Sequence, residues 1–398
     1  MCIKLILTAK QQEALKIAVD RYNLGEKFTV ISGYAGSGKS TVVRFIIDAL
    51  QVNPQEDVSY VAFTGKAAKV LAQKGCPNAT TAHKLLYMAR PTPDGGYIYT
   101  PKPIIDTPIV VVDEISMLPK KMWDLLLTHQ VYVIACGDPG QLPPINPDDD
   151  NHVLDTPHVF LDEIMRQAQE SEIIRLSMHV REGGSLSDFV CAGTEVQIID
   201  ASQVVEGMYT WADQILCATN NRRNEVNQIL RKIKGFGPEP CVGDKVISLR
   251  NHWDDLSFPS GNPLTNGTIG YLEEYTKTSL WVPSFIYKDN DIPVARITMR
   301  AEDDDEFCVT ADYKCLATGE KTLDPKQEYI MNKNKRYPNA PYEFVYGYGI
   351  TVHKAQGSEW DKVLIFEEGF PFAKEEHQRW LYTAITRASK KLVIVKKG

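Results

Sequence analysis

The sequence predicts an α/β fold of two parallel-sheet domains, with a small hairpin inserted in the first domain and a β-rich segment inserted in the second. Two observations support this prediction. Short apolar runs alternate with helical periodicity in two stretches of the chain, which is typical of parallel strands joined by helical crossovers. Within the second stretch, residues 243–341 are instead rich in Gly, Pro and Asn and carry short β-like runs.

The first domain is expected to span residues 1–170. Its buried strands are predicted at Phe28–Ser32, Tyr60–Phe63, Ile109–Val112 and Val131–Ala135. A helix is predicted over Ser40–Leu50, where four apolar residues recur at spacings of three and four. An insertion at about residues 86–108 contains Pro93-Asp94-Gly95-Gly96-Tyr97, a strong turn signal between two candidate strands of a hairpin.

The second domain is expected to combine residues 171–242 with residues 342–398. Its strands are predicted at Gln214–Ala218, Phe344–Tyr346, Val363–Phe366 and Leu392–Val395. The inserted domain between these two parts spans residues 243–341. Its clearest β-like runs are Lys245–Leu249, Thr268–Leu272 and Ala295–Met299.

Composition narrows the class of protein. The 398 residues suggest more than one domain, and no apolar run approaches the roughly 20 residues that cross a bilayer. The eight cysteines form no CxxC pair, so we expect free thiols, no zinc site and no disulfide framework. With no signal peptide recognised, we expect a cytoplasmic protein. The net charge of −7 argues weakly against nucleic-acid binding by bulk attraction, yet it leaves room for a local basic channel.

Gly33-Tyr34-Ala35-Gly36-Ser37-Gly38-Lys39-Ser40 matches the phosphate-binding pattern GxxxxGK[ST]. It follows a predicted strand and opens a predicted helix, which is the context that this pattern requires. Lys39 is expected to reach the β- and γ-phosphates of ATP, and the Ser40 hydroxyl to ligate Mg²⁺. The residues expected to hold the nucleotide here are Gly33, Gly36, Ser37, Gly38, Lys39, Ser40 and Thr41.

Two further strand ends supply polar side chains near that loop. Asp113 and Glu114 follow three valines, so both carboxylates lie at the carboxyl end of a predicted strand. We expect Asp113 to hold Mg²⁺ through water, and Glu114 to orient and deprotonate the attacking water. Gln141 follows the next strand within Gly137–Pro144, where it is placed to touch the γ-phosphate.

With Asp113-Glu114 and Gly137–Pro144 in place, the chain resembles superfamily 1 helicases, particularly the RecD-like and phage Dda-like branch. Six more stretches resemble its motifs in order: Leu7–Gln11 the Q motif, Ala62–Ala68 and Thr80–His83 motifs Ia and Ib, Glu163–Gln167 motif IV, Gly349–Glu359 motif V, and Tyr382–Ala388 motif VI. The resemblance implies two RecA-like P-loop domains with ATP between them, and it likens the inserted β-rich domain to an SH3-like domain.

The same resemblance assigns further residues to ATP. Gln11 would read adenine, with Gln12 as a rival, and Glu359 would lie on the ribose beside Gly357. Arg166 and Arg387 would touch the γ-phosphate as arginine fingers from the other side of the site. Arg175 and Arg181 lie near Arg166 in the sequence and remain open as alternatives for it.

The resemblance also implies a single-stranded DNA track. The candidates for it are Phe63, Thr64, Lys66, His83, Thr351, His353 and Lys354. Core packing stays open for Phe63, and a buried structural histidine for His83. The branch further implies 5′ to 3′ movement, contacts with fork DNA and with replication or recombination proteins, and a monomer, because one chain contains both halves of the ATP site.

The predicted hairpin occupies the interval that holds a strand-separating pin in related helicases. Tyr97 and Tyr99 are two apart, so in a strand they share one face, and an aromatic ring there can stack on the last base pair. An ordinary surface hairpin whose tyrosines pack on the first domain is the alternative. Two other classes remain possible, a P-loop ATPase of another kind that unwinds nothing and a non-catalytic nucleic-acid-binding module.

Overall fold

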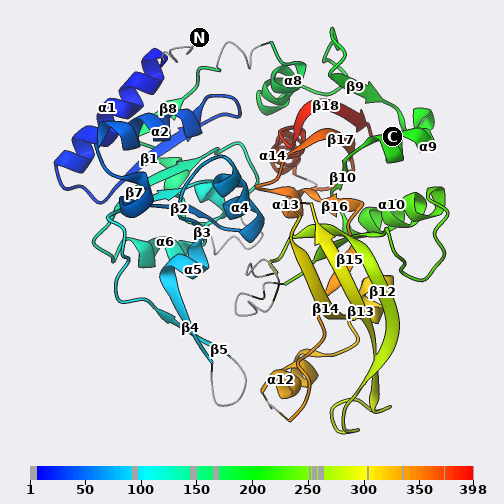
Figure 1. The fold of residues 1–398 in the computed structure, drawn as a ribbon. Helices are drawn as coiled ribbons and strands as arrows, with labels where there is room; N and C mark the ends of the chain where they lie inside the picture. The colour runs from blue at the N-terminus through cyan, green and yellow to red at the C-terminus, as the bar shows by residue number, and fades with distance from the viewer. Residues whose placement is uncertain are drawn as a thin grey trace.

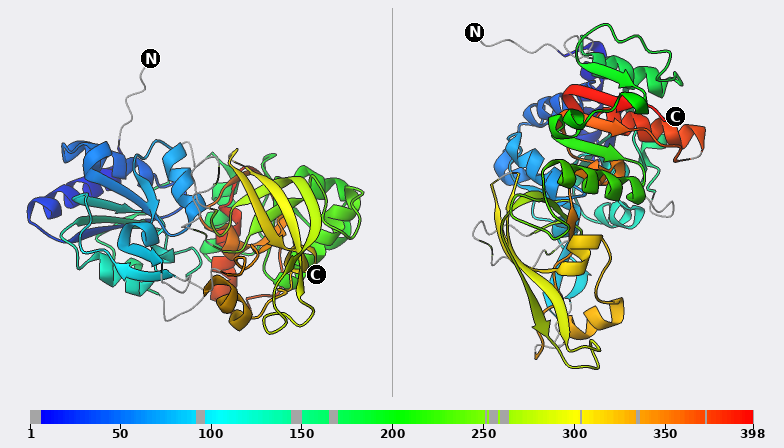
Figure 2. Two further views of the ribbon diagram at one scale, coloured as in Figure 1. Left: turned by 60° about the horizontal axis from the view of Figure 1, so that its bottom comes forward. Right: turned by 90° about the vertical axis from the view of Figure 1, so that its right-hand side faces the viewer.

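The computed structural model describes residues 7–91, 97–143, 150–164, 170–250, 252, 258, 264–302, 304–333, 336–371 and 373–397. Two parallel sheets with flanking helices lie side by side, and an antiparallel sheet extends from the second (Figure 1). A turned view separates the first domain, in blue and cyan, from the rest of the chain (Figure 2, left). The predicted α/β class with parallel sheets is therefore confirmed.

The first sheet has six parallel strands and carries the phosphate-binding loop. In order across the sheet these are β3 (Ala79–Thr81), β2 (Val58–Ala62), β6 (Ile109–Val112), β7 (Tyr132–Gly137), β1 (Phe28–Gly33) and β8 (Val159–Leu161). Its main helices are α1 (Ala9–Asn23), α2 (Lys39–Ala49), α4 (Gly65–Gln73), α5 (Ala82–Leu86) and α6 (Lys120–Leu126). The helix predicted over Ser40–Leu50 is thus confirmed as α2.

Both faces of this sheet are buried. Successive strand residues point to opposite faces, so Ile31 packs with α1 and α2 whereas its neighbour Val30 packs with α5 and α6. A strand covered on both sides needs apolar residues at every position, not at alternate ones. This explains why the strands could be predicted from unbroken apolar runs.

The second sheet is also parallel and has five strands. Across the sheet they are β16 (Gly349–Thr351), β10 (Gln214–Cys217), β17 (Trp360–Phe366), β18 (Ala388–Val395) and β9 (Val196–Ile199). Helices α8 (Glu172–Arg181), α13 (Val352–Ala355) and α14 (Lys374–Ile385) pack in the core of one face, and α9 (Glu206–Trp211) and α10 (Asn220–Ile233) in that of the other.

The inserted region folds around an antiparallel sheet with its own apolar core. The strand order is β14 (Glu306–Asp312), β13 (Asp291–Ala301), β12 (Ile269–Trp281), β11 (Lys245–Ser248) and β15 (Phe344–Tyr346). Two helices, α11 (Tyr313–Thr318) and α12 (Pro325–Lys333), follow β14 in the chain. In the side view the long yellow strands extend away from both parallel sheets (Figure 2, right).

One predicted strand belongs to a different sheet. Phe344–Tyr346 was expected in the second parallel sheet, but it pairs antiparallel with β11 as the edge strand of the inserted sheet. The place beside β10 is taken by β16, only a few residues later in the chain. The prediction was wrong because a short apolar run reports burial but not which sheet completes its hydrogen bonds.

The hairpin insertion of the first domain is present as a two-stranded antiparallel sheet. Strand β4 (Tyr87–Pro91) pairs with β5 (Tyr97–Pro101), and Ala89 lies opposite Tyr99. The turn residues 92–96 lie outside the described residues. Among the residues described, no helix is long and apolar enough to span a membrane.

Candidate active site and nucleic-acid interface

The phosphate-binding loop joins the carboxyl end of β1 to the first turn of α2. Gly36 and Gly38 have φ angles of 77° and 80°, a left-handed conformation that glycine adopts without strain. A Cβ on Gly33 would lie 2.8 Å from Leu161 Cβ, so this position also requires glycine. Ser40 and Thr41 follow in the first turn of α2. The backbone therefore has the curled form that presents N–H groups to a phosphate.

Hydrogen bonds from side chains of the loop region and from helix α1 hold the phosphate-binding loop in place. Lys39 Nζ donates to the carbonyl oxygens of Gly33 at 2.7 Å and Tyr34 at 3.0 Å. The Ser37 hydroxyl donates to Tyr34, and the Ser37 carbonyl accepts from the buried amide of Gln11 at 3.0 Å. Gln11 also completes a capping box with Thr8 at the start of α1. Gln11 thus supports the phosphate loop here, and its contact with adenine stays a prediction.

Asp113 and Glu114 extend from the end of β6 into the same region. Glu114 has a φ angle of 49°, a left-handed conformation that is uncommon for a residue other than glycine. Burial raises the pKa of both carboxyls, and the positive charge of Lys39 opposes the rise at Asp113. Within the described residues, Glu114 Oε2 is enclosed and has no hydrogen-bond partner.

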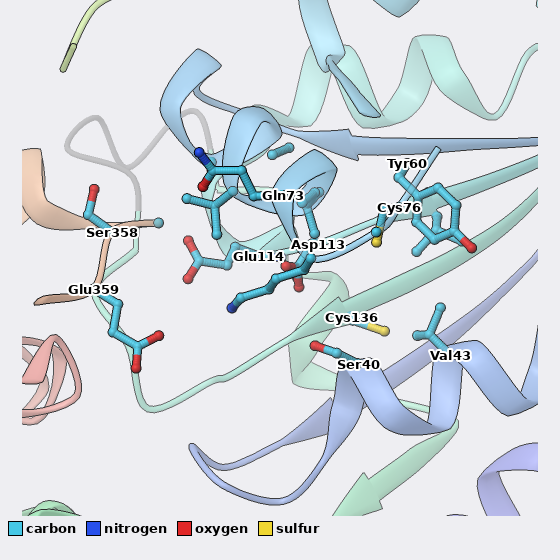
Figure 3. Close-up of a pocket in the computed structure, with 18 of the residues that line it drawn as sticks. Ser40, Val43, Tyr60, Gln73, Cys76, Asp113, Glu114, Cys136, Ser358 and Glu359 are labelled. Carbon is cyan, nitrogen blue, oxygen red and sulfur yellow. Dashed lines mark hydrogen bonds between the residues drawn. The ribbon is translucent and has the colours of Figure 1, made fainter. Parts of the chain in front are cut away.

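A cavity of about 1140 Å³ separates the two parallel-sheet domains at this point. Figure 3 shows Ser40, Asp113 and Glu114 on the side of the first domain, with Ser358 and Glu359 on the side of the second. Six of the predicted ATP-site residues line this one cavity: Ser40, Asp113, Glu114, Gly357, Glu359 and Arg387. These residues come from four motifs that are far apart in the sequence, and the fold brings them together at one cavity.

Arg387 reaches the cavity from the residues that follow α14. Arg387 is 6% exposed, and its guanidinium donates to the carbonyl oxygens of Thr383 and Ser358 and to the Thr386 hydroxyl. Arg387 Nη1 lies 3.7 Å from Glu114 Oε1, and this positive charge opposes the burial that raises the Glu114 pKa. The predicted arginine finger and the predicted general base therefore face each other across the domain boundary.

The turn after β7, which includes Gln141, is attached to the second domain. The Gln141 side chain is partly exposed, and its backbone N–H donates to the carbonyl of Asp138. The next residue, Leu142, donates its N–H to the Thr383 hydroxyl and accepts from the Gln356 amide, both at 2.9 Å. Gln141 is not among the residues that line the cavity, so its contact with the γ-phosphate stays a prediction.

The predicted arginine of motif IV, Arg166, lies outside the described residues. Of its two alternatives, Arg175 pairs with Glu172 at 3.6 Å on the second domain. Arg181 lies at the domain boundary instead, with its guanidinium 3.2 Å from the ring centroid of Tyr34 in the phosphate loop. Arg181 is therefore the alternative that the fold places beside the nucleotide site.

The predicted DNA contacts of the first domain begin at α4. The Thr64 hydroxyl caps this helix by accepting from the Ala67 N–H. Lys66 lies 3.3 Å from Glu302 of the inserted domain and 4.6 Å from the centroid of the Trp360 ring. Lys69 on the same helix pairs with Asp305. Both lysines thus face acidic residues of the inserted domain that lie far away in the sequence.

Phe63 and His83 lie together rather than on separate surfaces. Their ring centroids are 5.9 Å apart, and His83 lies 6.2 Å from Tyr87. Phe63 and Tyr87 pack against the core beneath α5 and α6. Burial lowers the pKa of His83, and within the described residues its buried Nδ1 has no hydrogen-bond partner. Core packing is thus observed for Phe63, and stacking on a base stays a prediction.

The candidates of motif V lie around α13, which begins directly after Thr351. Thr351 is partly buried, and burial lowers the pKa of both His353 and Lys354. Lys354 Nζ donates to the side chain of Asn266 at 2.7 Å. The neighbouring Thr265 leaves no space for a Cβ on Gly65 at the start of α4. One turn of the inserted domain therefore touches both sets of predicted DNA-binding residues.

The two tyrosines of the hairpin are described to different extents. Tyr99 is 50% exposed, which leaves its ring accessible on the hairpin surface. The side chain of Tyr97 lies outside the described part of the structure, although its backbone pairs with Pro91. Stacking of either ring on a base pair stays a prediction.

Comparison with known proteins gives matches in both parts of the chain. A family model described as an AAA domain matches residues 6–201, and one described as a UvrD-like helicase C-terminal domain matches residues 346–395. The ATP-dependent DNA helicase dda of Enterobacteria phage T4 is 23% identical, over 96% of this chain and 97% of that protein. The ATP-dependent RecD2 DNA helicase of Deinococcus radiodurans is 25% identical, over 92% of this chain and 46% of that protein.

Solved structures support the same assignment at the level of the fold. Pif1 helicase from Bacteroides, in complex with ADP-AlF3 and ssDNA, has a TM-score of 0.56 and 18% identity, covering 98% of this chain and 92% of that one. Pif1 helicase from Candida albicans has a TM-score of 0.51 and 18% identity, covering 99% and 95%.

Fold and site together define a P-loop protein in which two α/β domains close on one nucleotide cavity. The matches identify its class more narrowly. The chain is similar to superfamily 1 DNA helicases, because Dda and RecD2 match it over nearly its whole length.

Proposed function

We propose that this helicase hydrolyses ATP in the cavity between its two parallel-sheet domains, and that it uses the accompanying domain movement to travel along single-stranded DNA and unwind duplex. One observation carries the proposal. Glu114 from the first domain and Arg387 from the second meet in the cavity with 3.7 Å between their charged groups. Catalysis therefore depends on closure of the domains, which links hydrolysis to movement.

Each residue has a distinct task in this scheme. Glu114 orients the attacking water and accepts its proton, which requires the carboxylate form. Arg387 neutralises negative charge that grows on the transferred phosphoryl group. Lys39 leaves the loop carbonyls for the β- and γ-phosphates. The second arginine is Arg166, or else Arg181, which stacks on the phosphate loop.

The residues present fit a magnesium ion. Ser40 and Asp113 line the same cavity with oxygen atoms, the donors that this ion prefers, and Lys39 is near enough to influence the Asp113 carboxyl. Ser40 and Asp113 would hold it together with phosphate oxygens. When bound, Mg²⁺ neutralises phosphate charge and polarises the bond that breaks.

The DNA track is proposed to cross both domains beside the inserted one. Phosphate contacts fall to Thr64 and Lys66 on one side and to Thr351, His353 and Lys354 on the other, with His83 nearby. The inserted domain, which we liken to an SH3-like domain, closes the track through the turn that contacts Gly65 and Lys354. One chain supplies both sides of the ATP site, which supports a functional monomer.

Hydrolysis of ATP with and without single-stranded DNA tests the proposal. We expect strong stimulation by DNA, and we expect Lys39→Ala to abolish hydrolysis while DNA binding remains detectable. DNA-independent hydrolysis would instead favour a P-loop ATPase of another class. On forked substrates, unwinding is expected only with a 5′ single-stranded tail, because 5′ to 3′ movement is proposed from the resemblance to the RecD-like branch. Unwinding that requires a 3′ tail would contradict this direction.

The hairpin β4–β5 is proposed as the pin that separates the strands, with Tyr97 and Tyr99 as stacking surfaces. Stacking of a base on an aromatic ring offsets part of the roughly 1–2 kcal/mol lost per opened step. Replacing residues 93–99 with a short Gly-Ser link should spare DNA-stimulated ATP hydrolysis and sharply reduce unwinding. Unchanged unwinding per ATP in a folded variant would exclude the hairpin from this role.

A further inference from the structure

One tyrosine hydroxyl connects the phosphate loop, the turn after β7 and helix α14 across the domain boundary. Tyr382 lies on α14 of the second domain, and its side chain is fully buried. Its hydroxyl accepts a hydrogen bond from the Ala35 N–H of the phosphate loop at 3.0 Å and donates one to Asp138 Oδ2. Asp138 is 2% exposed and also holds the turn after β7, by accepting from the Gly140 N–H at 2.9 Å.

The hydroxyl is suited to this position because it can donate and accept at the same time. Burial and the adjacent Asp138 carboxylate both raise the pKa of Tyr382, so its hydroxyl keeps its proton at neutral pH. A phenylalanine would fill the same volume but would leave the Ala35 N–H and one Asp138 oxygen without this partner. Buried polar groups without partners are costly.

The neighbours of Tyr382 show that the contact belongs to a larger attachment. The next residue, Thr383, accepts from the Leu142 N–H beyond the same turn, and Arg387 reaches Glu114 from the residues just after the helix. One rigid segment of the second domain thus touches the phosphate loop, the turn that carries Gln141, and the proposed general base. A displacement of this segment changes all three together.

We infer that Tyr382 is a positioning residue that makes closure of the two domains depend on the state of the phosphate loop. The inference rests on the proposed function, because it assigns the closure that couples ATP to DNA. Ala35 lies within the loop that wraps the phosphates, so a nucleotide that orders the loop also fixes the donor that Tyr382 requires. In an open molecule this hydrogen bond is lost, whereas bonds within one domain remain.

Tyr348→Phe provides a matched control for Tyr382→Phe. The Tyr348 side chain is also buried, and its hydroxyl donates to the buried Asp244 at 3.1 Å. That bond joins the second domain to the base of the inserted domain and lies away from the nucleotide cavity. Both variants remove one hydroxyl from a buried tyrosine–aspartate pair, so a loss of stability alone should be similar in the two.

The decisive measurement is the coupling between two ligands. Affinity for a fluorescent single-stranded DNA is measured by anisotropy with and without a non-hydrolysable ATP analogue, and the ratio gives the coupling factor. In Tyr382→Phe the coupling factor should be closer to one than in the wild type, by up to about tenfold. This is the size of effect expected from the loss of one buried hydrogen bond to a charged group. Steady-state hydrolysis should show kcat lower by about tenfold with KM for ATP within twofold. Tyr348→Phe should leave both readouts close to wild type.

Two results would overturn the inference: wild-type coupling and kcat in Tyr382→Phe, or equal losses in Tyr348→Phe. A failure of the proposed function is distinguishable from either. If the wild-type protein does not hydrolyse ATP, the proposed function fails, yet the binding measurement still decides the role of Tyr382 because it involves no hydrolysis.

Discussion

Gly357 offers the most direct test of the idea that catalysis needs close contact between the domains. It belongs to the second domain and has a φ angle of 75°, and a Cβ added to it would lie 2.8 Å from Ala67 Cβ on α4 of the first domain. The same Cβ would lie 3.4 Å from Glu114 Oε2. Since Ala67 Cβ is fixed to the helix backbone, Gly357→Ala can be accommodated only if the two domains separate.

The size of the effect follows from these distances. Ordinary van der Waals contact begins at 3.4 Å, so the facing surfaces must move apart by about 0.6 Å. A misplacement of roughly 1 Å in an active site costs about 10²-fold in rate, so we expect kcat to fall roughly tenfold. The left-handed backbone adds about 1–2 kcal/mol of strain to the folded state, whatever the neighbours.

Gly235→Ala separates the two contributions. Gly235 has the same φ angle of 75°, yet a Cβ there would meet nothing within 4 Å. Both variants should lose a similar few degrees of Tm, and only Gly357→Ala should lose DNA-stimulated ATP hydrolysis at saturating ATP. Equal kcat values in the two variants would refute the reasoning, because interdomain contact would then be irrelevant to the rate.

Two further predictions concern charged groups. Glu114→Gln should lower kcat about 10²–10⁴-fold while ATP still binds. In the wild-type protein, kcat/KM should fall as the pH drops through the raised pKa of Glu114, because a protonated carboxyl cannot accept a proton from the attacking water. This acid limb should lie above 4.5, the ordinary value, and a limb at or below it would contradict the role. Glu302→Gln should remove the ion pair that holds Lys66, so that Lys66 can contact DNA phosphates instead. We expect the affinity for single-stranded DNA to rise roughly fivefold, which corresponds to the free energy of one partly buried ion pair. Glu306→Gln, which removes a partner of Arg300 within the inserted sheet, is the control, and equal tightening in both would point to net charge instead.

The sequence was sufficient to predict features that depend on local chain geometry. The phosphate loop needs glycine where φ is positive, and Gly36 and Gly38 mark those positions directly. The strand before Asp113 is buried on both faces, so its composition alone identified it. For such features, the amino acid at a position reports the backbone conformation or the burial that the position requires.

Contacts between distant segments left no comparable signal. Tyr382 meets Ala35 across 347 positions, and Lys66 meets Glu302 across 236, so neither pair could be read from spacing. The apolar run Phe344–Tyr346 was assigned to the wrong sheet for the same reason, since strand pairing is a tertiary property. Glu302 also pairs with Lys245, and neither lysine lies near it in the sequence.

Helix α4 connects the nucleotide cavity to the proposed DNA track. Ala67 faces Gly357 of the second domain, while its neighbour Lys66 contacts both the Trp360 ring and Glu302 of the inserted domain. Residues next to each other on one helix move together, so a shift of the second domain against Ala67 also changes the position of Trp360 over Lys66. Lys66 then has to redistribute its contacts among Trp360, Glu302 and a DNA phosphate. In the proposed mechanism, ATP-driven closure and DNA binding therefore compete for the same ammonium group, which is a physical route by which one ligand alters the affinity for the other.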